Sequence, residues 1–318
     1  MQLVLVILGA ILGLVYGYNS DGFIFNSNIC LFAGLTMIMP TLFKVKLSDI
    51  KLLVEYKGVV FKSLMINYIV LPLIALAIGF ATNNFGVAAG LFLLSVLSGG
   101  GMVMHWIKKS GADASMGFLL LFMNLIFVSL SLLMLHAFGM QTSEYFGESY
   151  ADEINMSNFA QAVIVLLIIV PFIVSRFIMM VKPLQDFIEK KRIYIGQMSI
   201  FVILFYLFGL QSSQLLFELY DFEPELFGIS IVAVVVFYLS VLLVSKFVYN
   251  LDSPQERAAY WHSVTRYITL ALVLSTFSTT TFGVSMLLPI MFAYIVQIPF
   301  AIFIDKKLIP KVNQKEKD

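Results

Sequence analysis

Four small residues in a row, Ser98, Gly99, Gly100 and Gly101, interrupt a long apolar stretch of this sequence. Consecutive glycines destabilise a helix interior by about 1 kcal/mol each relative to alanine, so the run predicts a break in a helix. In lipid, the backbone groups freed at a break must be met by protein, water or a bound solute. Free carbonyls on one side and free N–H groups on the other can form an ion or anion site. The alternative is that these small residues let two helices pack closely.

A single arginine, Arg266, lies roughly 13 Å into another apolar stretch, at about 1.5 Å per helical residue, and therefore near the centre of a bilayer. A charge at that depth costs several kcal/mol unless it meets a partner or a wet cavity, and no Asp or Glu lies in the middle of an apolar stretch. Its remaining partners are backbone carbonyls, such as those freed at the glycine run, or a bound anion. Alternatively, its side chain reaches back to the inner headgroups. We predict that Arg266 and its neighbours Tyr267 and Thr269 bind substrate together with Ser98–Gly101.

Two histidines lie close to these residues. His262 precedes Arg266 by four positions and shares its helix face, so the arginine favours a neutral imidazole. His105 follows the glycine run. Each is a candidate proton carrier, and the alternative for each is a hydrogen-bonded packing residue.

The other polar residues inside apolar stretches are amides, and we expect them to form hydrogen bonds between helices. They are Asn67, Asn124, Gln211 and Gln297. The sequence contains no phosphate-binding loop, no HExxH motif, no paired carboxylates within an apolar stretch and no nucleophile beside a base. It therefore predicts no enzyme, no cofactor and no metal site.

Composition predicts a membrane protein, because 60% of the residues are hydrophobic and only 12% are charged. The apolar residues come in long runs, each close to the roughly 20 helical residues that cross a bilayer. We expect ten spans, at 2–18, 23–43, 58–81, 86–107, 114–138, 158–181, 194–216, 225–247, 257–277 and 281–304. The first span is interpreted as a retained helix and not as a cleaved signal.

The loops between these spans are strongly asymmetric in charge. Every Lys and Arg except Arg266 falls on one side, whereas the other side carries only acidic charge. A miscounted span would invert every later loop, so the asymmetry supports the count and places both termini in the cytoplasm. We predict a multi-pass protein of the cytoplasmic membrane. With a net charge of +1, its expected partners are the lipid bilayer and a small-molecule or ion substrate, and no nucleic acid; the oligomeric state is not indicated.

Ten spans divide into two sets of five, residues 1–157 and 158–318. When an odd-numbered unit is duplicated, the second copy inserts upside down, which is the inverted-repeat plan of many transporters. The predicted fold is therefore an all-α membrane protein of two inverted five-helix repeats.

Several motifs along the chain resemble the arsenite-efflux permease family, a branch of the bile acid/sodium symporter superfamily. Pro40–Val45 resembles the P-x-x-x-K-V end of its second span, and Asn67–Pro72 has the spacing of N-W-x-x-x-P in its third. Gly99–Asn124 follows its C-T-A-M-V-x-x-W…G-D…N pattern, Gln211 falls at its L-Q, and Val296–Pro299 resembles its V-E-V-P. These matches occur in order over nearly the whole chain.

The resemblance implies that broken spans four and nine cross at the substrate site, where Asn124 is the polar family position retained here. It also implies a core of spans 3–5 and 8–10 that moves against a panel of spans 1, 2, 6 and 7. The family's cysteine is Gly99 in this sequence, and the sodium-binding Glu and Gln of the bile-acid branch are His262 and Arg266. Because Na⁺ is bound by oxygen, these replacements argue against thiol-based arsenite handling and against the usual sodium coupling.

Three functions follow as hypotheses. The first is a secondary transporter that moves a small anionic or metalloid solute by alternating access, with His262 or His105 linking transport to protons. The second keeps the fold and makes the protein an arsenite or antimonite exporter that uses shape and hydrogen bonds. The third, from another class, is a non-transporting membrane receptor or assembly factor.

Overall fold

The computed structural model describes residues 2–20, 22–23, 51–100, 102–150, 169–209 and 224–309, and these segments are helical with short connections. The first half contains α1 (Gln2–Asn19), α3 (Lys51–Glu55), α4 (Lys57–Met65), the π-helix η2 (Ile66–Val70), α5 (Leu71–Thr82), α6 (Phe85–Val96), α7 (Val103–Lys109), α8 (Ala114–Ile126), α9 (Val128–Thr142) and the 3-10 helix η3 (Glu144–Phe146). The second half contains α11 (Val170–Met180), α12 (Lys182–Phe208), α14 (Pro224–Val248), α15 (Pro254–Val264), α16 (Ile268–Phe282), the 3-10 helix η5 (Val284–Met286) and α17 (Leu287–Lys307).

Three helical stretches among the described residues are long and apolar enough to cross a membrane, namely Lys57–Thr82, Glu225–Val248 and Leu287–Lys307. The pair α8 and α9 passes the same test together and forms a fourth if it is one span bent by 48°. The predicted spans at 86–107 and 257–277 are each divided into two shorter helices. Those at 23–43, 158–181 and 194–216 lie largely or partly outside the described residues. The plan of ten spans in two inverted repeats therefore stays a prediction.

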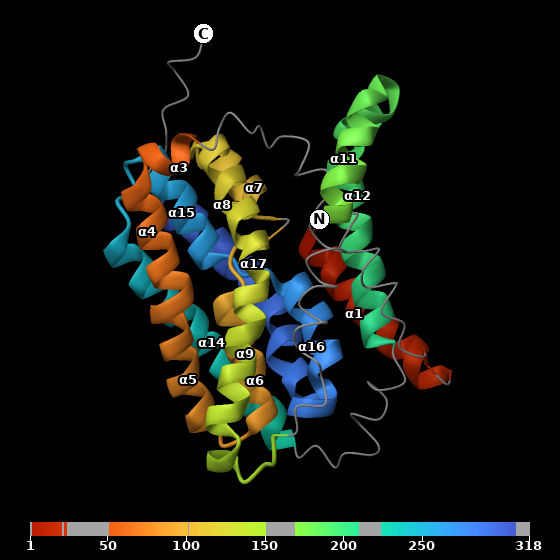
Figure 1. The fold of residues 1–318 in the computed structure, drawn as a ribbon. Helices are drawn as coiled ribbons and strands as arrows, with labels where there is room; N and C mark the ends of the chain where they lie inside the picture. Colours follow the sequence, from red (N-terminus) through yellow and green to blue (C-terminus); the bar gives the residue numbers. More distant parts are fainter. Residues whose placement is uncertain are drawn as a thin grey trace.

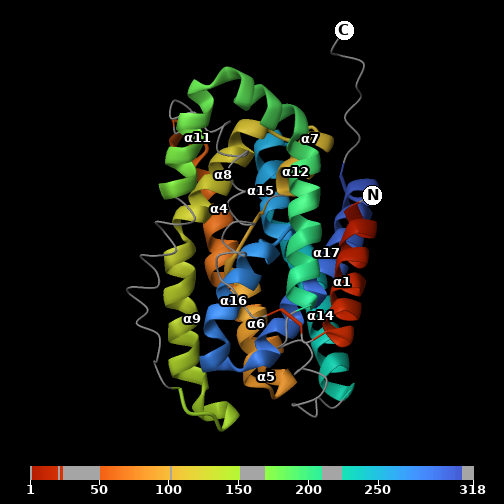
Figure 2. The same ribbon diagram turned by 90° about the vertical axis from the view of Figure 1, so that its right-hand side faces the viewer.

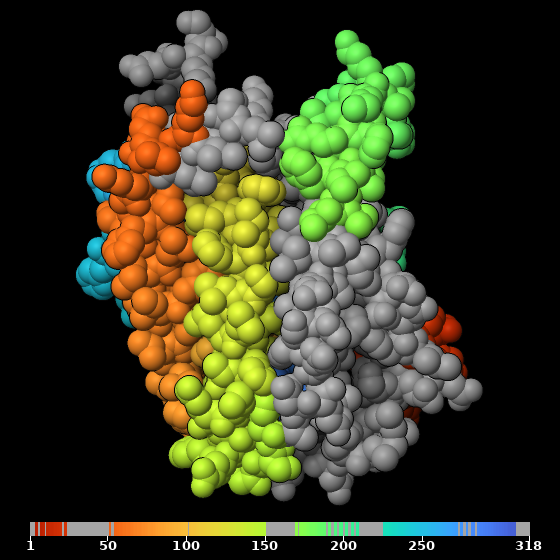
Figure 3. All heavy atoms as spheres, in the orientation of Figure 1, coloured from red at the N-terminus to blue at the C-terminus, as the bar shows by residue number. Residues whose placement is uncertain are grey.

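The helices form a bundle with α1 and α12 lying side by side along one flank (Figures 1 and 2). Their close approach depends on small residues, because a Cβ added to Gly13 would lie only 2.5 Å from the Phe205 carbonyl oxygen. Gly17, one turn later, faces Gly209 in the same way, with 3.3 Å between its added Cβ and the Gly209 Cα. On the face shown in Figure 3, α4–α5 (orange) and α8–α9 (yellow) lie next to each other.

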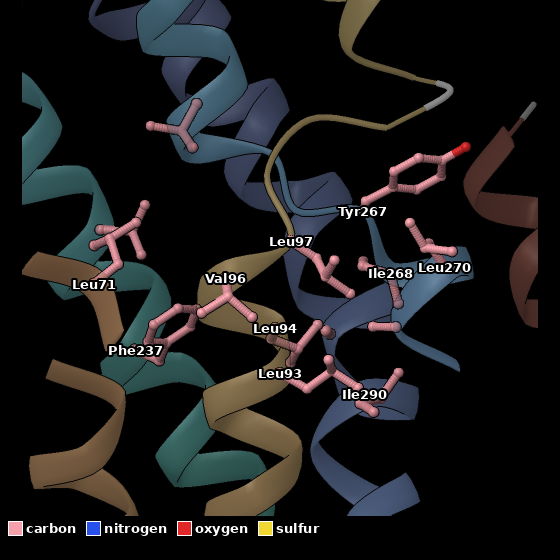
Figure 4. Close-up of a cluster of buried hydrophobic side chains, with 14 of the residues drawn as sticks. Leu71, Leu93, Leu94, Val96, Leu97, Phe237, Tyr267, Ile268, Leu270 and Ile290 are labelled. Atoms are coloured by element: carbon pink, nitrogen blue, oxygen red, sulfur yellow. The ribbon is translucent and has the colours of Figure 1, made fainter. Parts of the chain in front are cut away.

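The centre of the bundle is α6, whose side chains are buried from Phe85 to Val96. A helix that is apolar on all sides needs neighbours on all sides. Figure 4 shows Leu93, Leu94 and Val96 lying between Phe237 of α14 and Ile290 of α17. Such burial fixes the C-terminal end of α6 in the middle of the molecule.

Local sequence signals account for where several helices begin. Asn84 caps α6, with its side-chain oxygen accepting from the Val87 N–H at 3.0 Å. Asp113 caps α8 by accepting from the Met116 N–H at 2.8 Å. Ser253 caps α15, and Pro254 follows at the first helical position, where its missing N–H costs nothing.

The wide turn of η2 also has a sequence cause. Pro72 lacks the N–H that would bond the Tyr68 carbonyl, and its ring crowds that carbonyl. Helical turns that must accommodate such a group widen into π-bulges. The π-turn Ile66–Val70 contains Tyr68 and also Asn67, which is fully buried. Pro72 thus contributes to the placement of Asn67 in the interior.

Candidate functional site

Two interrupted helices meet in the interior of the bundle. Helix α6 ends at Val96 and α7 begins at Val103, while α15 ends at Val264 and α16 begins at Ile268. The segments between them form an isolated antiparallel bridge, in which Ser98 pairs with Arg266. The glycine run therefore breaks its helix, as predicted.

The glycines are required by backbone geometry at this point. Gly99 has φ +76° and Gly100 has φ +135°, conformations that other residues rarely adopt. A Cβ on Gly99 would also lie 2.5 Å from the Nδ1 atom of His262. Gly101 lies outside the described residues.

Backbone hydrogen bonds join the two breaks directly. The Gly99 N–H donates to the Thr265 carbonyl at 2.8 Å and to the His262 carbonyl at 3.0 Å. In return, the Tyr267 N–H donates to the Leu97 carbonyl at 3.0 Å. Each break thereby satisfies backbone groups that the other one frees.

Arg266 lies at this junction with 1% of its surface exposed. Its Nε donates to the Leu94 carbonyl at 2.9 Å, and its Nη1 donates to Asn67 Oδ1 at 2.7 Å and to the Ser263 carbonyl at 3.0 Å. Its Nη2 donates to the Ser95 carbonyl. The guanidinium thus meets carbonyls of the first break, which were one of the partners left open by the sequence, and it is enclosed by protein. Contact with an anionic solute stays a prediction.

The C-terminal end of α6 leaves carbonyls without helical partners, and each finds a donor. Leu94 and Ser95 accept from Arg266, Val96 accepts from the Ser131 hydroxyl at 3.1 Å, and Leu97 accepts from the Tyr267 N–H at 3.0 Å. The break after α6 is therefore stabilised by hydrogen-bond donors from α9 and from the second break.

His262 and Asn124 form a second polar pair beside the glycines. The Nε2 atom of His262 lies 2.8 Å from the Gly117 carbonyl, which can only accept, so Nε2 carries a proton. The Nδ1 atom lies 3.5 Å from the Asn124 amide nitrogen and accepts from it in the neutral ring. Both side chains are buried.

Two buried polar atoms at this place have no hydrogen-bond partner in the part of the chain that the structure describes. They are the Ser98 hydroxyl oxygen and the Asn124 Oδ1 atom. Both residues neighbour the first break, Ser98 directly and Asn124 through the His262 ring against which Gly99 packs. Buried polar groups are nearly always paired, so unpaired ones at a break need an explanation.

The remaining predicted site residues differ in their relation to the junction. Tyr267 is buried within it, where a Cβ on Gly100 would lie 3.3 Å from both its Cα and its Cδ2 atom, and its ring points away from Leu93 and Ile290 (Figure 4). The Thr269 hydroxyl is buried and accepts from the Tyr294 hydroxyl of α17 at 2.7 Å. His105 has an exposed side chain on α7, beside the Trp106 ring, and is not joined to the junction by these contacts.

Asn67 and Gln297 are part of the junction, although the sequence indicates only that they are polar residues within spans. Asn67 receives Arg266, and Gln297 Oε1 accepts from the Arg266 backbone N–H at 2.6 Å and from the Tyr238 hydroxyl at 2.7 Å. Gln211 lies outside the described residues. An amide side chain within an apolar stretch is the only sequence signal for such a role, and it does not indicate which distant residue the amide contacts.

The described residues contain no group of three or more His, Cys, Asp or Glu side chains that could hold a metal ion. The family model described as "Sodium Bile acid symporter family" matches residues 29–216, which is more than half of the chain. The match includes the glycine run and Asn124 and ends before Arg266. No curated protein matches the chain.

Proposed function

Because the chain belongs to the Sodium Bile acid symporter family, we propose that it carries a small anionic or metalloid solute across the cytoplasmic membrane by alternating access. We place the solute at the junction of α6–α7 with α15–α16. Membership of a transporter family makes the protein a secondary transporter of the membrane and places it outside the enzyme families. The identity of the solute and the location of its site are the proposal.

The observation that supports this site is that two of the six buried side-chain atoms without partners among the described residues, Ser98 Oγ and Asn124 Oδ1, lie together beside the junction. Leaving such a group unpaired costs about 1–3 kcal/mol, so a fold tolerates it where another molecule supplies the missing partner. Ser98 can donate or accept, whereas the Asn124 oxygen can only accept. Together they suit a small solute that carries both oxygen and a hydroxyl or N–H group.

Arg266 acts on such a solute through its charge. The four oxygens that bind its guanidinium belong to backbone carbonyls and an amide, none of which carries a formal charge. The positive charge is therefore not neutralised locally, and in a low-dielectric interior it is felt over several ångströms. An anionic solute, or one that becomes anionic, is favoured near the Ser98–Arg266 bridge.

His262 offers a way to couple the solute to protons. In the neutral ring, Nδ1 accepts from the Asn124 amide and leaves Oδ1 unpaired. A protonated ring would present a donor to Asn124 at that position, which favours rotation of the amide so that Oδ1 accepts from it. Protonation would thereby remove the acceptor that we assign to the solute.

Transport by purified protein in proteoliposomes tests the proposal. The probes are a bile acid, arsenite and a short-chain carboxylate, each measured as saturable uptake. We expect one of them to be carried by the wild type, and Ser98→Ala to lower uptake at least tenfold. The melting temperature of Ser98→Ala should be unchanged or higher, because the substitution removes an unpaired buried hydroxyl.

Ser129→Ala is the matched control, since Ser129 is a partly exposed serine whose hydroxyl donates locally to the carbonyl of Ile126, three residues earlier at the end of α8, at 3.4 Å. It should leave both uptake and melting temperature unchanged. Full uptake by Ser98→Ala would refute the proposed site. Restored growth of an arsenite-sensitive cell would identify the solute as the metalloid, whereas uptake of the carboxylate alone would identify an organic anion.

A further inference from the structure

The atoms around Arg266 form a cage of oxygens that is built from three separate elements. The Leu94 and Ser95 carbonyls come from the end of α6, the Ser263 carbonyl comes from the end of α15, and Asn67 Oδ1 comes from η2. The guanidinium lies among them and is shielded from solvent. A positive group at this point is bound by oxygen from several directions.

The charge distribution of the cage favours any cation. Carbonyls in the last turn of a helix carry the negative end of the helix dipole, and two such helix ends point at the same place here. Backbone carbonyls and amide oxygens are also the ligands that hard metal cations accept. The cage therefore has the chemistry of a cation site, and its occupant is the side chain of Arg266.

The walls of the cage are fixed by further hydrogen bonds. The Asn67 amide nitrogen donates to the Ser63 carbonyl at 2.8 Å, which orients its oxygen toward Arg266. The buried Ser263 hydroxyl, which lies 3.0 Å from the Tyr249 hydroxyl, also accepts from the Asn67 amide nitrogen at 3.5 Å and so helps to hold the Asn67 side chain. Ligands held in this way stay in place when the central group is changed.

We infer that Arg266 is a built-in cation that occupies a site suited to a sodium ion, so that this transporter needs no sodium ion at that position. The tethered charge stabilises the two helix ends permanently, whereas a free ion would do so only while bound. This inference rests on the proposed function and deepens it by removing a sodium ion at this position from the transport cycle. Its test measures stability and not transport, so its failure is distinguishable from failure of the proposed solute site.

The experiment compares thermal unfolding of full-length wild type, Arg266→Ala and Arg266→Lys in detergent. Each protein is measured in choline chloride, potassium chloride and sodium chloride at constant ionic strength. In choline, Arg266→Ala should melt lower than the wild type by about 5 °C or more, because four oxygens lose their buried cation. Sodium should raise its melting temperature saturably and more than potassium does. Wild type and Arg266→Lys should show no such sodium response.

The double variant Asn67→Asp/Arg266→Ala adds a carboxylate to the emptied cage and should respond to sodium at lower concentrations than Arg266→Ala. If Arg266→Ala cannot be purified without sodium, purification in its presence supports the inference. Three results overturn it. The first is a sodium-specific stabilisation of the wild type that Arg266→Ala lacks. The second is an Arg266→Ala variant that is as stable as the wild type in choline, or that is destabilised there and gains no more from sodium than from potassium. The third is failure of Arg266→Lys, Arg266→Ala and the double variant to fold in every salt.

Discussion

Gly99 carries two constraints at once, one from its own backbone and one from its neighbour. Its φ of +76° is strained for any residue with a side chain, and its position leaves no space for a Cβ beside His262. Its N–H also donates to both His262 and Thr265 on the second break. A single glycine thus determines how closely the two breaks approach each other.

Gly99→Ala should lower the free energy of unfolding by about 2 kcal/mol or more, since backbone strain and a steric clash add together. Thermal denaturation of the purified protein measures the change. Gly58→Ala is the matched control, because Gly58 lies in helix α4 and a Cβ added to it would meet no atom within 4 Å. That substitution should be neutral or stabilising by up to about 1 kcal/mol. Equal stability of both variants would show that position 99 accepts a side chain without backbone strain or a clash with His262, and would contradict the prediction.

At the scale of elements, the interruption of α6 depends on a donor from α9. The Ser131 hydroxyl is buried and donates to the Val96 carbonyl at 3.1 Å, and it lies 3.2 Å from the Phe127 carbonyl of its own helix. Serine hydroxyls that bond back to their own helix tend to bend it. Helices α8 and α9 meet at Phe127 with a bend of 48°. One side chain therefore links a helix end to a helix bend.

Ser131→Ala should cost about 1–3 kcal/mol of stability, because the Val96 carbonyl would be left buried without a donor. Ser131→Cys, whose thiol is a weak donor of similar size, should recover part of that loss. The unfolding midpoint measured by tryptophan fluorescence separates the two variants from the wild type. A midpoint of Ser131→Ala equal to that of Ser129→Ala would contradict the assigned role of this hydroxyl.

The sequence predicts these elements unevenly. The glycine run carries its own signal for a break, because its effect on a helix is local. The partners of Arg266 carry no such signal, since Asn67 lies 199 residues away and its relation to Arg266 depends on how several helices pack. The predicted span 114–138 contains no proline that would indicate a break near Phe127, so its division into α8 and α9 was not expected. Tertiary hydrogen bonds decide such features.

At the scale of the whole molecule, the charge asymmetry of the loops predicts which ends of the bundle face the cytoplasm. It places Glu148 outside and Lys246 inside. Both residues are exposed in the structure, Glu148 after η3 and Lys246 in the last turn of α14. The orientation of the protein in the membrane can therefore be read at these two positions.

The chain contains one cysteine, Cys30, so Cys30→Ser gives a background without thiols. In that background, Glu148→Cys should react with a membrane-impermeant maleimide on intact cells. Lys246→Cys should react only after the membrane is permeabilised. Labelling is read as a mass shift on a gel. The reverse pattern would overturn the predicted orientation, and labelling of both positions from the same side would overturn the predicted number of spans between them.

The antiparallel bridge between Ser98 and Arg266 has a mechanical consequence. Because each break satisfies backbone hydrogen bonds of the other, neither can bend alone without breaking hydrogen bonds in the buried interior. The junction is therefore a rigid connection and not a hinge, and the half-helices that it joins must move together as one rigid body. Any rocking that exposes the solute alternately to the two sides of the membrane must then occur where this rigid body and α17, which packs on it, meet the rest of the bundle, such as the contact of α17 with α1.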